Sequence, residues 1–120
     1  MQQGALAYAA TAQKTASPRE LEAQLLLRAA RKLAAASMPE ATNTEIREAA
    51  NFNRRLWTIF VAAVTDETSP LPVPLRQNLA NIGIFVLNRS VELEAAPERE
   101  RIAPLVSINR NIAAGLAGRA

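Results

Sequence analysis

Pairs of acidic residues are the most evident groups in this sequence that could perform chemistry, because two carboxylates can supply the general acid and the general base of an enzyme. The pairs are Glu20/Glu22, Glu92/Glu94 and Glu98/Glu100. On a helix, residues two apart point in different directions, so the members of such a pair do not converge on one substrate. We therefore expect these carboxylates to lie on a solvated surface.

Other catalytic combinations lack a necessary part. The chain contains no histidine and no cysteine, so a serine has no imidazole to activate it and zinc has no thiolate or imidazole ligand. Its four glycines are isolated and form no phosphate-binding loop. The sequence thus predicts a protein that is not an enzyme and that has no cofactor and no metal site.

Asn53 stands in the middle of an apolar helical arc. At 100° per residue, the large side chains around it close into one face, formed by Phe52, Leu56, Trp57, Ile59, Phe60, Ala63 and Val64. Burying an amide without a partner costs about 1–3 kcal/mol, so Asn53 should have a specified hydrogen-bond partner. Asn78 and Asn109 fall inside the arcs of two other expected helices, and we predict a buried polar cluster of all three. The alternative is that the predicted helix phase is off by one residue, or that each asparagine lies at a boundary, and that the side chains are exposed.

Candidate contacts with a partner are fewer. Arg54 and Arg55 fall outside the apolar arc, where they form either a binding surface or an ordinary solvated face, and RNA contact has weak support because no exposed stacking aromatics are apparent. Trp57 lies at the edge of the arc and is either a core residue or an anchor for a partner. The predicted partner-binding residues are Leu6, Tyr8, Arg54, Arg55, Trp57 and Arg110.

The composition favours helices. Hydrophobic residues make up 49% of the 120 residues but aromatic residues only 4%, and alanine and leucine supply the difference. The net charge of +3 is spread over the chain without a dense basic block. No secretory signal and no apolar stretch of bilayer length is visible, so we expect a cytoplasmic protein without a membrane segment.

The helices should begin and end at recognisable residues. Residues 4–15 form an alanine-rich segment with Leu6 and Tyr8, expected as a loosely docked helix. A capping box starting at Ser17 opens the next helix, which should end near Ser37. A third runs from about residue 45 to 64, capped by Asn43 or Thr44, and a proline-rich connection follows over residues 66–74.

The C-terminal third is less clearly marked. Helical periodicity resumes at Leu75, with Leu79, Ile82, Phe85 and Val86 on one arc, although residues 84–87 could alternatively be a short strand. We expect a last helix to begin at Pro97. Pro104 lies inside its pattern and should either kink this helix or mark its true first turn. The overall prediction is an all-α fold in one domain, residues 1–120. It is a bundle of four to five helices in which residues 1–16 are loosely docked.

Five segments together resemble the FlaF family, flagellar biosynthesis regulators of α-proteobacteria. They are residues 17–22 (SPRELE), 53–60 (NRRLWTIF), 71–76 (Leu-Pro and Leu-Arg), 83–86 (GIFV) and 108–116 (INRNIAAGL). Pro104, just before the last segment, departs from the uninterrupted helix expected there.

The resemblance implies a cytoplasmic protein needed for flagellin production or export, acting alongside FlbT, a protein linked to flagellin messenger RNA. On this basis the expected function is that of a flagellin-binding export chaperone that also feeds back on flagellin synthesis. The N-terminal helix is then a candidate latch over the binding groove. The alternative is a post-transcriptional regulator that contacts RNA, directly or through FlbT. A third possibility is a structural scaffold that forms homo-oligomers.

Overall fold

Four α-helices make up most of residues 18–118, the part of the chain that the computed structural model describes. They are α2 (Pro18–Ala36), α3 (Asn43–Thr65), α4 (Val73–Ala95) and α5 (Ala103–Leu116), with a 3₁₀ turn, η1 (Arg99–Arg101), before α5. This part contains no strand, so the all-α prediction is confirmed, and residues 84–87 lie within α4. None of these helices combines the length and the apolar character that crossing a bilayer requires.

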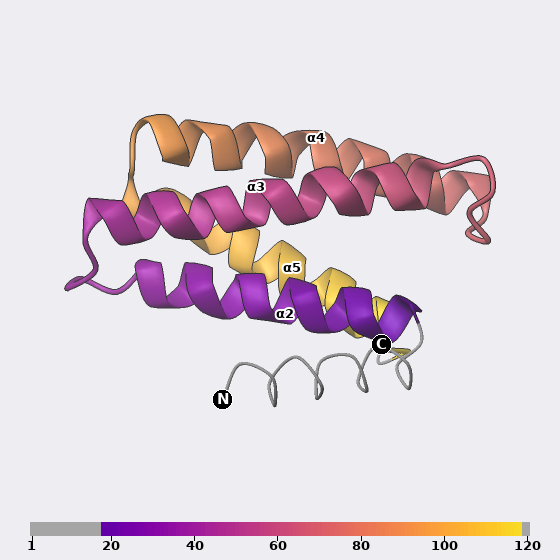
Figure 1. Ribbon diagram of the computed structural model, residues 1–120, viewed down its shortest axis with the longest axis horizontal. Coiled ribbons are helices and arrows are strands. Elements are labelled where there is room, and N and C mark those ends of the chain that lie inside the picture. Colours follow the sequence, from indigo (N-terminus) through magenta and orange to yellow (C-terminus); the bar gives the residue numbers. More distant parts are fainter. Residues whose placement is uncertain (1–17, 119–120) are drawn as a thin grey trace, which may run out of the picture.

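The helices pack as two antiparallel pairs that share one core. α3 and α4 lie side by side as a hairpin, and α5 crosses obliquely behind α2 and α3 (Figure 1). The pairs in close contact are α3 with α4, α2 with α5, and α2 with α3. α4 therefore lies at the outer edge of the bundle, with α3 as its principal neighbour.

The start of α3 differs from the sequence prediction. Its N-cap is Thr42, whose Oγ1 accepts a hydrogen bond from the Glu45 N–H (3.1 Å), while the Thr42 N–H donates to Glu45 Oε1 (3.3 Å). A capping box requires Glu or Gln three residues after the cap. Neither Asn43 nor Thr44 meets that condition, so the choice of those two residues as caps was wrong.

Pro104 marks the true start of the last helix, and Pro97 does not open it. α5 begins at Ala103 with Pro104 in its first turn, where a missing N–H leaves no hydrogen bond unmade. Residues 97–98 are not helical, and the chain passes through η1 instead. This connection is held at Arg99, whose Nη2 donates to the Ala41 carbonyl oxygen (2.9 Å).

The buried face of α4 is rotated relative to the predicted arc. It consists of Leu79, Gly83, Val86, Ser90 and Leu93. Leu75 and Phe85, which the sequence places in the core, are exposed, as is Ile59 of α3. The prediction followed the large side chains, whereas the buried face of α4 also includes the small residues Gly83 and Ser90. α4 consequently carries apolar residues on both of its faces.

Gly83 permits the close approach of α3 and α4, because a Cβ built there would collide with Cγ2 of Val61. Gly83→Ala improves helix propensity, but we expect the clash to prevail and to lower the free energy of unfolding by about 1–2 kcal/mol. A Val61→Ala background removes the colliding methyl group. In that background Gly83→Ala should leave the free energy of unfolding unchanged or raise it. Urea denaturation of the four proteins of this cycle measures the coupling. Equal effects of Gly83→Ala in both backgrounds would show that the clash does not exist.

Candidate functional site

A chain of hydrogen bonds crosses the centre of the core and links three helices. Trp57 Nε1–H donates to Asn109 Oδ1 (2.9 Å), Asn109 Nδ2 donates to Asn53 Oδ1 (2.7 Å), and Asn53 Nδ2 donates to Ser90 Oγ (3.1 Å). The Ser90 hydroxyl then donates to the Val86 carbonyl oxygen (2.7 Å). The four side chains that donate are entirely inaccessible to solvent. We refer to Trp57, Asn109, Asn53 and Ser90 as the buried polar chain.

The direction of the buried polar chain follows from one residue. An indole nitrogen can only donate, so Asn109 must present its oxygen to Trp57 and its amide nitrogen to Asn53. Asn53 in turn presents its oxygen to Asn109 and its nitrogen to Ser90. Asn109, Asn53 and Ser90 therefore each accept one hydrogen bond and donate another, which specifies how α3, α4 and α5 align.

Two sequence predictions change at this point. Asn53 and Asn109 are buried as expected, but Asn78 is exposed near the start of α4, because the rotation of that helix turns it to solvent. Trp57 is wholly buried, with its ring edge-on to Phe60 at a centroid separation of 5.2 Å. Trp57 thus presents no surface to a partner in this structure, and the prediction of it as a contact residue is corrected to a core role.

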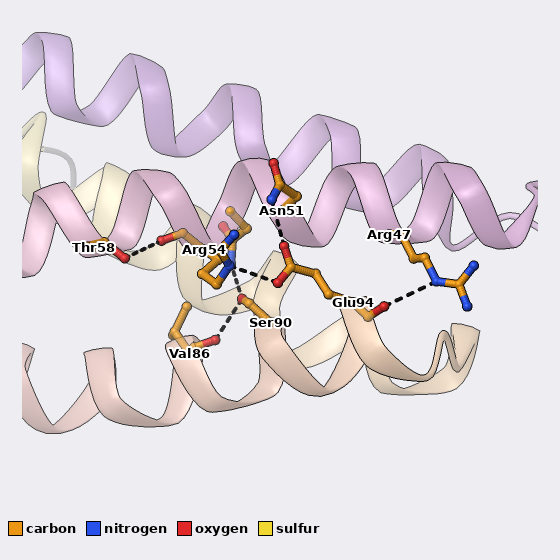
Figure 2. A network of polar contacts seen from close by, with 8 residues as sticks. Arg47, Asn51, Arg54, Thr58, Val86, Ser90 and Glu94 are labelled. Atoms are coloured by element: carbon orange, nitrogen blue, oxygen red, sulfur yellow. Dashed lines mark hydrogen bonds and ion pairs between the residues drawn. The ribbon is translucent and has the colours of Figure 1, made fainter.

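A second polar group lies on the outside of the α3–α4 hairpin and is centred on Glu94 (Figure 2). Asn51 Nδ2 donates to Glu94 Oε1 (2.8 Å), and Arg54 Nε forms an ion pair with Glu94 Oε2 (2.8 Å). Arg47 Nε donates to the Glu94 backbone carbonyl (3.2 Å) in the last turn of α4. Arg47 and Arg54 are therefore engaged within the chain rather than simply solvated.

Glu92 and Glu94 diverge as expected for a spacing of two residues, and they allow a matched comparison. Glu94→Ala should lower the free energy of unfolding by about 1–2 kcal/mol, since it removes two hydrogen bonds to a half-buried carboxylate. Glu92→Ala removes the ion pairs that an exposed carboxylate forms with Arg89 and Arg101, and it should cost less than about 0.5 kcal/mol. Chemical denaturation at low and high salt checks both values. Equal costs would show that the Glu94 contacts add no stability.

An open groove of about 470 Å³ lies between α2 and α3. We call it the α2/α3 groove. It is lined by Leu25, Lys32, Glu48, Asn51, Phe52, Arg55, Leu56 and Ile59. Four of them are apolar. Ile59 is 70% exposed, the largest exposure among the big hydrophobic side chains of residues 18–118. Phe52 and Leu56 are half-buried, one turn apart along α3.

Cations dominate the rim of the α2/α3 groove. Arg28 and Lys32 of α2 lie over the Phe52 ring at 5.5 and 5.1 Å from its centroid, and the exposed Arg55 lies on the α3 side. Glu48 is the acidic residue of the lining. The groove thus combines an apolar floor with an excess of positive charge, an arrangement suited to an amphipathic segment that carries acidic residues beside its apolar stripe.

The predicted partner-binding residues do not form one site. Arg55 lies in the α2/α3 groove, and Arg54 belongs to the Glu94 group. Arg110 lines a different hollow of about 420 Å³, between α2 and α5. Leu6 and Tyr8 fall outside the described residues. Ile59 was not predicted to be a surface residue, because it falls on the same helical arc as Phe60 and Val64, which are buried.

Within residues 18–118, two titratable groups have shifted pKa values, and neither of them lines the groove. Burial raises the pKa of Glu22, opposed by the nearby Arg19. Hydrogen bonds from the Thr68 hydroxyl and backbone lower the pKa of Asp66 at the end of α3. In residues 18–118 no group of three or more acidic side chains is placed to hold a metal ion. The chemistry that the groove itself offers is binding through apolar contact and charge.

Comparison with known proteins identifies one relationship. Residues 5–116 match the family model described as the flagellar protein FlaF. The search of the curated proteins and the search of the solved structures found no match. The matched range includes every element of the bundle described above.

Proposed function

Because the chain belongs to the FlaF family of flagellar proteins, we propose that it binds unassembled flagellin as an export chaperone and couples flagellin secretion to its synthesis. The observation that carries this proposal is the α2/α3 groove, with its exposed Ile59 and basic rim. Unassembled flagellin has amphipathic terminal segments that associate when the filament forms. A helical adaptor that covers such a segment would delay that association until export.

The proposed interaction needs no catalysis. Apolar contact with Leu25, Leu56 and Ile59 supplies most of the binding free energy, and Lys32 and Arg55 orient the segment through its acidic residues. Ordering the flagellin segment consumes part of that energy, so moderate affinity and reversible release are expected. Both properties suit a carrier that must give up its client at the export apparatus.

The regulatory part of the proposal follows from occupancy. When synthesis outpaces export, unassembled flagellin accumulates and most of the chaperone is bound to it. When export keeps pace with synthesis, most of the chaperone is free. The ratio of free to flagellin-bound protein would then regulate the translation of flagellin messenger RNA. The protein would do so together with FlbT, in the cytoplasm where flagellin is made. In this scheme contact with RNA is indirect.

Titration of the purified chain with monomeric flagellin tests the proposal, using calorimetry at low and at physiological salt. We expect saturable binding that depends only weakly on salt, because apolar contact dominates. Binding of flagellin messenger RNA that falls steeply with salt, without binding of flagellin, would contradict the proposal and favour a post-transcriptional regulator that touches RNA.

A further inference from the structure

Within residues 18–118, three cations beside the α2/α3 groove form no ion pair. They are Arg28, Lys32 and Arg55, and all three side chains are exposed. Glu48 lines the same groove, yet it pairs with none of them. Six other arginines in this part of the chain are instead bound to a carboxylate or to a backbone carbonyl oxygen: Arg47, Arg54, Arg76, Arg89, Arg99 and Arg101. The three cations at the groove are thus available to an acidic partner.

Phe52 holds two of these cations at one place. The Arg28 guanidinium carbon lies 5.5 Å from the centroid of the Phe52 ring, and the Lys32 ammonium nitrogen lies 5.1 Å from it. Arg28 and Lys32 are four residues apart on α2, so their charges repel each other. The face of an aromatic ring attracts a cation within about 6 Å, and this attraction offsets the repulsion. Phe52 therefore keeps two like charges together at the groove.

This arrangement suits the recognition of carboxylates. Arginine and lysine side chains lose rotational freedom when they bind a ligand, and that loss weakens binding. Contact with the Phe52 ring restricts both side chains before a ligand arrives, so less freedom is lost on binding. Unlike a carboxylate, the ring carries no net charge and leaves the two positive charges uncompensated. The neighbouring Leu56 and Ile59 add apolar contact area, which favours an acidic peptide over RNA as the ligand.

We propose that Phe52 is a positioning residue of the α2/α3 groove, which holds Arg28 and Lys32 in place to bind acidic residues beside the apolar stripe of the client. This proposal rests on the proposed function, because it takes the client to be flagellin. It adds two requirements. The bound segment must carry carboxylates next to its apolar stripe, and the aromatic ring must contribute more than its apolar area.

Calorimetric titration with monomeric flagellin tests the role of the ring. Phe52→Leu keeps an apolar side chain but removes the ring, and it should weaken binding about 5-fold. Phe52→Tyr keeps the ring and should restore the affinity to within about twofold of the wild type. Phe85→Leu is the matched control and should leave the affinity unchanged. Arg89 lies over the Phe85 ring at 5.1 Å, but on α4, where it also donates to the Arg101 carbonyl oxygen.

A double-mutant cycle separates positioning from apolar contact. Arg28→Gln combined with Lys32→Gln alters only exposed side chains and should by itself weaken flagellin binding at least about 5-fold. In that background Phe52→Leu should change the affinity less than about twofold, since neither cation remains to be positioned. An equal loss in both backgrounds would show that the ring supplies apolar contact alone, and would overturn the proposal. Unchanged flagellin binding after removal of both cations would overturn it too, even if Phe52→Leu unfolded the chain.

The failure of this proposal is distinguishable from the failure of the proposed function. A wild-type chain that does not bind flagellin contradicts both. A wild-type chain that binds flagellin, with a Phe52→Leu variant that binds it equally well, contradicts only the positioning role. A single-stranded RNA oligonucleotide is titrated in parallel. RNA binding that Phe52→Leu weakens, with flagellin binding unchanged, would assign the cations to phosphate groups and overturn the proposal.

Discussion

Replacing Asn53 with alanine is expected to lower the free energy of unfolding by about 3 kcal/mol. The substitution removes the middle of the buried polar chain, so Asn109 Nδ2 loses its acceptor and Ser90 Oγ loses a donor. An unsatisfied buried amide costs about 1–3 kcal/mol, and the space left by the carboxamide adds to that cost. Thermal and urea denaturation measure the loss, and the melting temperature should fall by more than about 10 °C.

Asn78 supplies the control for this experiment, because it is the same residue type on a neighbouring helix but is exposed. Asn78→Ala should change the free energy of unfolding by less than about 0.5 kcal/mol. Because alanine has a higher helix propensity than asparagine, the change should be an increase. Similar values for the two variants would show that the buried polar chain does not stabilise the bundle.

Replacing Ile59 with aspartate is expected to weaken flagellin binding at least about 30-fold while leaving the fold intact. Ile59 is the most exposed apolar residue of the α2/α3 groove, so the folded protein loses little when a carboxylate replaces it. In the complex the same carboxylate would be desolvated against an apolar stripe, and central interface positions commonly contribute about 2 kcal/mol or more. Calorimetric titration with monomeric flagellin gives the ratio of dissociation constants.

Ile84→Asp is the matched control for flagellin binding, because Ile84 is comparably exposed but lies on the outer face of α4. Its affinity for flagellin should equal that of the wild type. If both variants retained full affinity, the groove would not be the flagellin site.

The helices and part of the polar cluster could be predicted from the sequence. Proline and capping residues mark the ends of helices through local chemistry, and the arcs around Asn53 and Asn109 identify buried faces. α4 could not be resolved in this way, because its apolar residues lie on two faces and its contact with α3 runs through Gly83 and Ser90. Hydrophobicity alone does not distinguish a face that packs from one that stays open.

The proposed binding surface was harder to predict than the core. Ile59, Leu56 and Phe52 continue the apolar pattern of α3, and only the position of α2 determines that they border an open groove. Arg54 and Arg55 are adjacent in sequence, yet one is held by Glu94 and the other is free to face the groove. Such differences depend on tertiary contacts with α2 and α4 that no local pattern encodes.

Site-specific photo-cross-linking to flagellin tests the central claim most directly. The chain has no native cysteine, so a photoreactive maleimide attached to Ile59→Cys or to Ile84→Cys modifies one known position in each protein. Irradiation with monomeric flagellin should give an adduct from position 59, mapped by mass spectrometry to an amphipathic terminal segment, and none from position 84. An adduct from position 84 with none from position 59 would contradict flagellin binding in the α2/α3 groove.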